Sequence, residues 1–315
     1  MKAALIGCGK AGADLLEELV GNNAITSIDI FDPRVHEMQN LNGLSSKIEL
    51  RSSSSPKDFD YQLAVIASPD HTHFKYAKDF LQNDVHSFIE KPMVTNSQDL
   101  ARLIKIVESR ADIKISNNFI LRASPLFQRL RELISDGVLG PKLFIEGKYL
   151  YGRWSKLMNG WRGSSLDDYS VILGGLIHIV DLCCYLTETF DFDVQQERIR
   201  LTDLPPNHIR DFGQIRLMSE KIGVCSLTTT FSSPVNHRRD ISIYGDLGWI
   251  EVIGESIQTG GSLAELGLEK LSTRSESKGT LLEEFIKKIQ GQPTRPHLCP
   301  SALEVIKVHE LLMEN

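Results

Sequence analysis

The stretch Met1–Gly12 reads MKAALIGCGKAG, and it decides how the chain begins to fold. The apolar run Ala3–Ile6 passes directly into Gly7–Gly12, whose glycines have the spacing G-x-G-x-x-G. In this pattern the first glycine permits a tight turn, the second lets the backbone approach a ligand, and the third lets a helix pack closely on the strand. We therefore expect a buried strand that leads through a short turn into a helix, as at the start of a doubly wound α/β domain.

The turn is also a candidate site for the pyrophosphate of a dinucleotide, because the N-terminus of the following helix offers unpaired N–H groups and a partial positive charge. A second apolar run, Ile25–Phe31, ends at Asp32, twenty residues after Gly12. A carboxylate there accepts hydrogen bonds from the adenosine ribose and repels a 2′-phosphate, so NAD is favoured. NADP stays open, because Arg34 can pair with that phosphate. The expected contacts in this part of the chain are Gly7, Cys8, Gly9, Lys10, Ala11, Gly12, Asp32 and Arg34.

Two sequence patterns, apolar and amphipathic, alternate over the first 118 residues. Apolar runs predict buried strands, and amphipathic stretches between them predict helices. Such alternation is typical of a parallel sheet with helices on both faces. The strands are expected at Ala3–Ile6, Ile25–Phe31, Leu63–Ala67, Ser87–Ile89 and Ile113–Ser116, and the helices at Ala11–Leu19, Val35–Leu41, Phe74–Gln82 and Gln98–Val107. We interpret the serine-rich run Arg51–Lys57 as a loop.

This alternation of sequence patterns ends after Asn118. Ser124-Pro125 predicts a helix start, and long strand-like runs joined by turn signals predict a mostly antiparallel sheet. We therefore expect a dinucleotide-binding Rossmann domain at 1–118 and an α+β domain for substrate binding and oligomerisation, with a large, mostly antiparallel sheet, at 119–315. Its strands are expected at Leu143–Tyr151, Ile209–Ser219, Ile222–Phe231, Asp240–Tyr244 and Trp249–Ile253, and its helices at Leu126–Ile134, Gly174–Thr187, Thr280–Ile289 and Ser301–Met313.

Composition limits the classes of function. The length of 315 residues exceeds a single ordinary core, which favours two domains. The net charge of −6 argues against nucleic-acid binding, and we recognise no signal peptide and no membrane span. The five cysteines are odd in number and form no C-x-x-C pair, so we expect reduced thiols in a cytoplasmic protein. We expect the partner of this protein to be a small-molecule substrate.

The polar segment Ser68–His73 follows the predicted strand Leu63–Ala67. Ligands of doubly wound sheets bind beyond the carboxyl ends of the strands, so we expect Ser68, Pro69 and His73 to border the cofactor. His71 and His73 lie two positions apart on a starting helix and point in different directions, and no cysteine or acid completes a ligand set. We therefore expect no metal site.

A further motif, Glu90-Lys91-Pro92, follows the apolar run Val85–Ile89. Taken with the glycine-rich turn and the segment Ser68–His73, it resembles the glucose–fructose oxidoreductase/inositol dehydrogenase (Gfo/Idh/MocA) family. The resemblance covers essentially the whole chain. It also includes GGLIHIVD at Gly174–Asp181 and IYGDLG at Ile243–Gly248.

The resemblance implies roles for particular residues. In that family the matching lysine, here Lys91, lies beside the nicotinamide and the substrate hydroxyl, and the histidine of the glycine-containing helix matches His178. It adds Glu90, Lys91 and Asn118 to the expected cofactor contacts. The family carries an aspartate four residues before that histidine, where this chain has Gly174. Asp167 and Asp168 are candidates to replace it.

Hydride transfer from a carbinol carbon requires removal of the hydroxyl proton, and the reverse reaction requires protonation of the alkoxide. We predict that His178 is the general acid/base, because imidazole titrates near neutral pH, and that Lys91 stabilises the alkoxide as a cation. The roles are exchanged if desolvation beside the nicotinamide favours neutral Lys91. His178 and Asp181 share one helix face, and a packing role for this pair is the alternative.

The segment Lys148–Tyr169 is rich in aromatic and arginine side chains, which pack on sugar rings and pair with carboxylates or phosphates. We expect it to face the substrate, with an oligomer interface or a plain surface loop as the alternatives. The candidate substrate contacts are Lys91, Tyr151, Trp161, Arg162, His178 and Asp181.

These features predict an NAD(P)-dependent dehydrogenase or reductase of a sugar, a cyclic polyol or a sugar nucleotide, assembled as a homodimer or homotetramer. Two alternatives stay open. One is an NAD-bound regulatory or binding protein without turnover, for which Gly174 would mark a degraded site, although the retention of Lys91 and His178 argues against it. The other is a reductase of a non-sugar carbonyl or imine.

Overall fold

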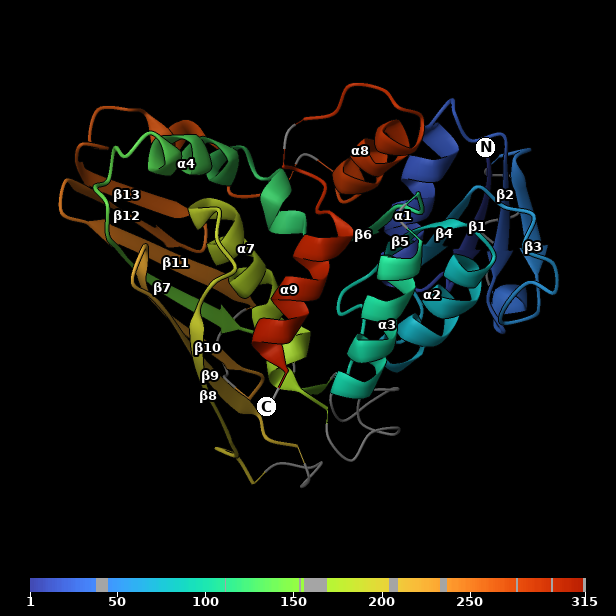
Figure 1. Ribbon diagram of the computed structural model, residues 1–315, viewed down its shortest axis with the longest axis horizontal. Helices are drawn as coiled ribbons and strands as arrows, with labels where there is room; N and C mark the ends of the chain where they lie inside the picture. Colours follow the sequence, from blue (N-terminus) through green and yellow to red (C-terminus); the bar gives the residue numbers. More distant parts are fainter. Residues whose placement is uncertain are drawn as a thin grey trace. The chain divides into compact units, whose positions relative to one another are not determined.

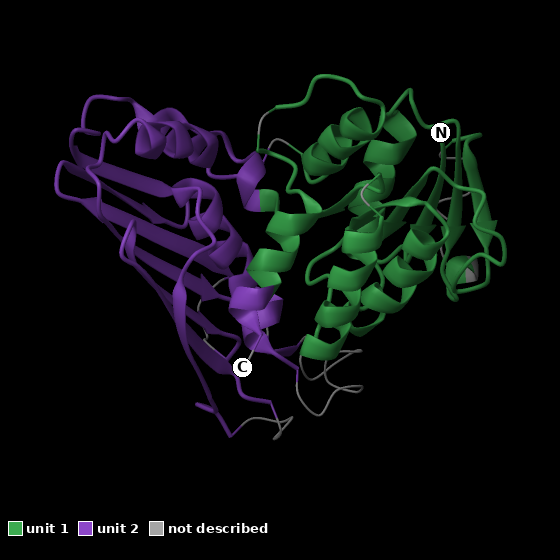
Figure 2. Ribbon diagram, in the orientation of Figure 1, with its two compact units in different colours: residues 1–120, 276–309 green, residues 121–275, 310–315 purple. Residues whose placement is uncertain are grey.

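The computed structural model describes residues 1–37, 45–110, 112–152, 154–155, 169–203, 209–232, 237–275, 277–295 and 297–313. The chain divides into two compact units (Figure 2). Unit 1 consists of Met1–Ile120 and Glu276–His309, and unit 2 consists of Leu121–Ser275 and Glu310–Asn315. The expected boundary after residue 118 therefore lies close to the observed one. The expected second domain, 119–315, is corrected at its end, because the segment 276–309 belongs to unit 1.

Unit 1 is built on a six-stranded parallel sheet in the order β3-β2-β1-β4-β5-β6 (Figure 1). Its first connection, through α1, runs to one side of β1, and the later connections, through α2 and α3, run to the other side. Since crossovers are right-handed, α1 covers one face of the sheet and α2 and α3 cover the opposite face. The predicted doubly wound architecture is confirmed. The strands are β1 (Lys2–Ile6), β2 (Ser27–Phe31), β3 (Ile48–Arg51), β4 (Leu63–Ile66), β5 (His86–Ile89) and β6 (Ile115–Asn117), and the helices are α1 (Lys10–Gly21), α2 (His73–Gln82) and α3 (Ser97–Ser109).

The sequence explains these elements locally. The central strands β1 and β4 are continuous apolar runs that are buried on both faces of the sheet. Helix α3 begins after Asn96, whose side chain accepts a hydrogen bond from the backbone N–H of Asp99. Of the helix expected at Val35–Leu41, the structure describes a short 3-10 turn, η1 (Val35–Glu37), and the rest lies outside the described residues.

Two helices from the end of the chain supply contacts within unit 1. Helix α8 (Thr280–Ile289) packs on β5 and α1, and the ring centroids of Phe285 and Phe88 are 5.7 Å apart. Helix α9 (Ala302–Leu312) brings His309 to the backbone of Met93. This packing is the physical reason for the corrected domain division.

Unit 2 contains a seven-stranded sheet in the order β13-β12-β11-β7-β10-β9-β8, in which only the described pair β7 and β10 is parallel (Figure 1). The predicted mostly antiparallel sheet is confirmed. The strands are β7 (Leu143–Leu150), β8 (Asp193–Ile199), β9 (Phe212–Ser219), β10 (Gly223–Thr230), β11 (Arg238–Gly245), β12 (Gly248–Ile253) and β13 (Ser256–Gly261).

Helix α7 (Ile177–Thr187) packs on β7 and β10, and α4 (Pro125–Ser135) packs on α7. A Cβ atom at Gly147 would lie 2.6 Å from Ile179 Cγ2, so the absence of a side chain on β7 permits this close approach. Helix α4 begins as expected, with Ser124 as its cap and Pro125 in its first turn. Within the described residues, no helix combines the length and the apolar character needed to cross a bilayer.

Candidate active site

The glycine-rich turn joins β1 to α1, and steric contacts explain its glycines. Gly7 has a φ of +83°, and a Cβ atom there would lie 2.8 Å from the backbone of Ser68. A Cβ atom at Gly12 would lie 2.1 Å from the carbonyl oxygen of Gly7. By contrast, a Cβ atom at Gly9 would meet no described heavy atom within 4 Å. The turn is therefore closed against the sheet and open beside Gly9.

The N-terminus of α1 suits an anion. Its cap residue is Gly9, and among the described side chains none caps it and no acidic residue occupies its first turn. The N–H groups of that turn are therefore left for an external acceptor, and the helix dipole favours negative charge there. Lys10 and Ala11 begin the helix and carry two of these N–H groups. These features fit the pyrophosphate of a dinucleotide.

Asp32 connects the turn to the end of β2. Its carboxylate is 5% exposed and accepts hydrogen bonds from the N–H of Cys8 at 3.0 Å and the N–H of Arg34 at 2.8 Å. The side chain of Arg34 is 67% exposed, with Nε 4.0 Å from Asp32. Burial, together with the nearby Asp32 carboxylate, raises the pKa of the Cys8 thiol to about 11. The thiol therefore stays neutral beside the turn.

His73 lies against the backbone of Ser68 and Pro92. Its ring is 1% exposed, with Nε2 2.8 Å from the carbonyl oxygen of Ser68 and Nδ1 2.7 Å from that of Pro92. Both ring nitrogens are used on the backbone, and the expected contact between His73 and the cofactor stays a prediction. Ser68 and Pro69 lie at the carboxyl end of β4, as expected. The described residues hold no group of three or more side chains arranged to bind a metal ion.

Glu90 and Lys91 follow the carboxyl end of β5, next to the residues that follow β6. Glu90 accepts hydrogen bonds from Asn118 Nδ2 at 2.6 Å and from the N–H of Lys91 at 3.3 Å. Burial raises the pKa of the Glu90 carboxyl, and the Asn118 hydrogen bond and the charges of Lys91 and His73 offset part of this effect. Lys91 itself is half-buried. The structure thus brings Glu90, Lys91 and Asn118 to one edge of the sheet, as the motif predicts.

Asn118 supplies a further test of whether a cofactor fits. Its side chain is 6% exposed, and its Oδ1 atom is buried and has no hydrogen-bond partner among the described residues. A buried acceptor of this kind usually has a partner, so a donor from a bound molecule would satisfy it. The carboxamide of a nicotinamide carries such a donor. Together with the open space at Gly9, this atom fits a dinucleotide.

In unit 2, His178 lies in the first turn of α7 and is 7% exposed. Its ring centroid is 6.5 Å from that of Tyr149, which in turn lies 5.8 Å from Tyr151. Tyr151 stacks on Phe231 at 4.2 Å, and His237 Nε2 is 3.1 Å from the Tyr149 hydroxyl. We call these rings the aromatic cluster. The members of the aromatic cluster are Tyr149, Tyr151, Tyr169, Phe231 and His237.

Gly174 has a steric explanation that the sequence does not reveal. It lies in a π-helical turn, η5 (Ile172–Leu176), directly before α7. A Cβ atom at Gly174 would lie 2.1 Å from the hydroxyl oxygen of Tyr169, whose ring is 6% exposed. The Tyr169 hydroxyl therefore fills the space in which a side chain at Gly174 would begin. The other candidates here, Trp161, Arg162, Asp167 and Asp168, lie outside the described residues.

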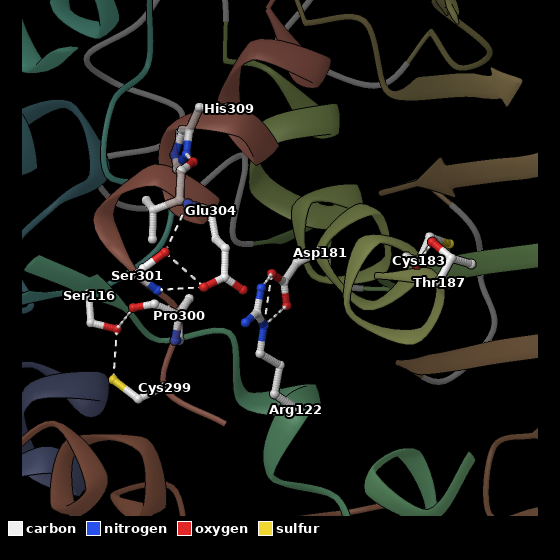
Figure 3. A network of polar contacts seen from close by, with 11 residues as sticks. Ser116, Arg122, Asp181, Cys183, Thr187, Cys299, Pro300, Ser301, Glu304 and His309 are labelled. Atoms are coloured by element: carbon white, nitrogen blue, oxygen red, sulfur yellow. Dashed lines mark hydrogen bonds and ion pairs between the residues drawn. The ribbon is translucent and has the colours of Figure 1, made fainter. Parts of the chain in front are cut away.

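Asp181 has a different partner from the expected substrate. It is fully buried, and its carboxylate faces the guanidinium of Arg122, which is also fully buried (Figure 3). Arg122 Nε lies 3.0 and 3.1 Å from the two carboxylate oxygens, and Nη2 lies 2.6 Å from Oδ1. In this structure Asp181 holds α7 to the turn η4 (Ile120–Ala123), and the substrate contact stays a prediction.

Arg122 is the residue that sequence reasoning missed. It stands in the apolar stretch Phe119–Ala123, and an arginine in such a setting is a signal that a buried acid must exist elsewhere. Its guanidinium carbon also lies 5.3 Å from the ring centroid of Tyr185 on α7. The sequence gives no means of choosing Asp181 as the acid, because the two positions are far apart along the chain.

Comparisons with known proteins agree with these features. Residues 1–119 match the model of the Gfo/Idh/MocA oxidoreductase family with an NAD-binding Rossmann fold, and residues 127–251 match a C-terminal domain model of the same family. An inositol 2-dehydrogenase of Salmonella typhimurium is 22% identical over 193 residues, which are 59% of this chain and 54% of that protein. One from Rhodococcus erythropolis is 24% identical over 67% of this chain and 60% of that protein. The chain thus matches little more than half the length of these relatives.

Solved structures show a similar fold. The WlbA dehydrogenase of Chromobacterium violaceum, in complex with NADH and UDP-GlcNAcA, superposes with a TM-score of 0.78 at 18% identity, covering 99% of this chain and 91% of that one. The myo-inositol dehydrogenase of Lactobacillus casei, in complex with NAD(H) and myo-inositol, gives 0.73 at 17% identity, covering 98% and 91%. With both of its units matched by family models, the chain belongs to the Gfo/Idh/MocA oxidoreductase family, and its first unit carries that family's NAD-binding Rossmann fold.

Proposed function

We propose that the protein is an NAD-dependent dehydrogenase or reductase that transfers a hydride between the nicotinamide and a hydroxyl-bearing carbon of a sugar, a cyclic polyol or a sugar nucleotide. The observation that carries this proposal is the edge of the parallel sheet in unit 1. It combines an uncapped helix N-terminus at Gly9, the Asp32 carboxylate and the half-buried Lys91. The solved relatives described with myo-inositol and UDP-GlcNAcA support the substrate class.

NAD, when bound, supplies the nicotinamide carbon that accepts or donates the hydride. The N–H groups at the start of α1 would hold its pyrophosphate, and Asp32 would accept hydrogen bonds from the adenosine ribose. Asp32 is already held in place by two backbone N–H groups, so it presents a negative charge that disfavours a 2′-phosphate. We therefore propose NAD over NADP.

Two side chains handle the proton in this proposal. Lys91 stabilises the developing alkoxide with its positive charge, because an ammonium group in a desolvated site interacts strongly with an oxyanion. His178 removes the hydroxyl proton in the oxidation and returns it in the reduction. Arg122 and Asp181 fix α7, the helix that carries His178, and the aromatic cluster buttresses the His178 ring through Tyr149.

The aromatic cluster also supports a ring-shaped substrate. Aromatic rings and tyrosine hydroxyls are groups that sugars and cyclitols contact in proteins, and Tyr151 keeps its role as a proposed substrate contact. Trp161 and Arg162 remain proposed contacts on the strength of the sequence alone. A cytoplasmic location and a homodimeric or homotetrameric assembly are likewise proposals.

The test is a screen of sugars, cyclic polyols and sugar nucleotides, in which the absorbance of the reduced nicotinamide is followed with NAD(H) and NADP(H) in parallel. We expect turnover with at least one member, its loss by more than a hundredfold in Lys91→Ala and His178→Ala, and wild-type rates in Lys105→Ala. Lys105 is a matched control because it is an exposed lysine on α3 of the same unit. The losses expected at Lys91 and His178 follow from their roles in proton handling.

Two other results would replace the proposal. Tight NAD binding without turnover of any compound would favour a non-catalytic, NAD-bound protein. Turnover only with carbonyls or imines outside the sugar classes would keep the hydride chemistry and change the substrate. Activity retained in both the Lys91 and the His178 variants would overturn the mechanism.

A further inference from the structure

The segment that follows Lys91 is held by two buried histidines on its own unit. The carbonyl oxygen of Pro92 lies 2.7 Å from Nδ1 of His73, which begins α2. The N–H of Met93 donates to Nε2 of His309, on α9, at 3.0 Å. Both rings are 1% exposed or less, so water does not compete for these contacts. The Pro92–Met93 peptide group, one residue beyond Lys91, is thus fixed on both its carbonyl and its N–H from different parts of the sequence.

The partners of His73 define its protonation. Each of its two ring nitrogens faces a carbonyl oxygen, that of Ser68 at 2.8 Å and that of Pro92 at 2.7 Å. A carbonyl oxygen only accepts, and a neutral imidazole has one N–H and one bare nitrogen. Both contacts are hydrogen bonds only if both nitrogens carry a proton, which makes the ring a cation. The charge of His73, like that of Lys91, stabilises the carboxylate of Glu90.

His309 has the opposite protonation. The N–H of Met93 only donates, so Nε2 of His309 must be bare, and Nδ1, 2.7 Å from the carbonyl oxygen of Val305, must carry the proton. The ring is therefore neutral, in the less common of the two tautomers. Burial lowers the pKa of His309 to about 4, and the hydrogen bond to Val305 opposes this effect in part. The ring stays neutral at physiological pH.

We propose that His73 and His309 are positioning residues for Lys91, a buried imidazolium and a buried neutral imidazole that together fix the carbonyl of Pro92 and the N–H of Met93. A shift of this segment would leave a buried donor or acceptor unpaired on one side or the other, which is costly. The Lys91 side chain therefore begins from a fixed backbone. The proposal rests on the proposed function only for what Lys91 does.

The protonation states are tested without any substrate. In protein labelled with ¹⁵N-histidine, we expect both His73 nitrogens to give protonated-type signals at pH 7. We expect His309 to give one protonated-type and one bare-type signal, the bare one coupled to the Hε1 and Hδ2 protons in the pattern of Nε2. His73→Asn and His309→Gln assign the signals by their disappearance. A bare nitrogen on His73, or a protonated Nε2 on His309, would overturn the proposal.

The positioning role is tested on Lys91 itself. An amine-acylating reagent, with peptide mass spectrometry across a pH series, measures the reactivity of Lys91 against that of Lys105 in the same molecule. We expect His309→Leu and His73→Leu to change the Lys91 profile at least threefold relative to Lys105. We expect His309→Gln to restore most of it, because its side-chain oxygen can still accept from Met93. An unchanged profile in both leucine variants would contradict the proposal.

Kinetics separate this proposal from the proposed function. If a substrate is found, His309→Leu should lower kcat about tenfold with little change in the KM for NAD, and His309→Gln should recover most of the loss. If no substrate turns over, the ¹⁵N signals and the Lys91 profile still decide the positioning role. If a leucine variant does not fold, as judged by its melting curve, His309→Gln and His73→Asn are compared with the wild type in its place. The proposal is supported if the Lys91 reactivity profile is preserved in His309→Gln and altered in His73→Asn, which keeps one of the two donors. Any other pattern opposes the proposal.

Discussion

At the scale of single residues, several glycines mark places where a neighbouring atom already fills the space of a side chain. Gly7 and Gly12 are of this kind, and their spacing makes them recognisable in the sequence. Gly174 is of the same kind, but its neighbour is the hydroxyl of Tyr169, a side chain whose rotamer no pattern predicts. The Tyr169 hydroxyl therefore explains the glycine at position 174, without recourse to a degraded site.

The first prediction concerns this contact. Gly174→Ala should destabilise the protein by about 1–3 kcal/mol, because the new methyl group meets the Tyr169 hydroxyl in a buried setting. In a Tyr169→Phe background the cost should be smaller, since the nearest atom has been removed. Urea denaturation of the four proteins measures the coupling. Gly21→Ala is the control, because no described atom lies within 4 Å of its added methyl group. Equal costs in the two backgrounds would contradict the steric explanation.

The second prediction concerns the choice of cofactor. Asp32→Gly should shift the ratio of NAD to NADP affinity at least tenfold towards NADP, because it removes the charge that repels a 2′-phosphate. NAD affinity should also fall, since the N–H groups of Cys8 and Arg34 lose their acceptor. Titration with both cofactors measures the ratio. Adding Arg34→Ala should weaken NADP alone, and Glu37→Gln, an exposed acid nearby, should leave the ratio unchanged. A constant ratio in Asp32→Gly would remove Asp32 from the cofactor site.

The third prediction concerns acid stability. The pKa of His309 falls from 6.5 to about 4 on folding, so the unfolded chain binds a proton on this ring at pH values where the native protein does not. Native stability should therefore decrease as the pH falls from 6.5 to 4, by about 3 kcal/mol from this group, and the group should have no effect above pH 6.5. His309→Gln removes the titration, so its stability should depend less on pH across this window. Parallel curves for both proteins would show that His309 does not titrate in this way.

At the scale of elements, the strands that the sequence failed to predict lie at the edges of the sheets. β3 ends the sheet of unit 1, and β8 and β13 end the sheet of unit 2. Their side chains alternate between half-buried and exposed for most of their length, because one face of each of these strands is exposed. Central strands such as β4 are continuous apolar runs and were predicted nearly to the residue. A strand that is buried on both faces is a continuous apolar run, and this run is the sequence pattern from which the strand is predicted.

The attachment of α7 leads to the fourth prediction. Asp181→Asn should destabilise the protein by about 3–5 kcal/mol, because it leaves the buried Arg122 cation without its countercharge. The double variant Arg122→Met, Asp181→Leu should lose less, since no charge remains buried. Urea denaturation gives both values. The exposed pair Arg129 and Glu132 is the control, and Glu132→Gln should cost less than about 1 kcal/mol. A milder effect in the single than in the double variant would argue against this ion pair.

At the scale of the whole molecule, local sequence patterns predicted the type of sheet in each of the two units. They did not predict that the segment 276–309 belongs to the first unit. The positions of Asp32, Ser68 and Glu90 at the carboxyl ends of strands were largely predictable, because these residues follow apolar runs at motif spacing. The roles of His73, His309 and Asp181 were not, because each depends on a buried partner that lies elsewhere in the sequence. The face of β5 that Phe285 covers gives no sign of what will cover it.

The fifth prediction follows from the discontinuous first unit. A fragment of residues 1–118 should lack a cooperative thermal transition, because it exposes the apolar surface that α8 covers and loses the hydrogen bond between Met93 and His309. A fragment in which 1–120 is joined by a glycine–serine linker to 277–309 should melt cooperatively and bind NAD. Circular dichroism and calorimetric titration measure the two properties. Comparable melting of both fragments would show that the C-terminal helices are dispensable for the first unit.

The same discontinuity sets an order of events on the ribosome. The strands of 2–117 emerge first, but Phe285 and His309 emerge after residues 121–275 of the second unit have been synthesised. The nascent first unit therefore waits with part of its sheet uncovered, while the second unit has all but its last few residues. Emergence of the segment 276–309, and not emergence of the glycine-rich turn, is the moment at which the NAD-binding unit becomes whole.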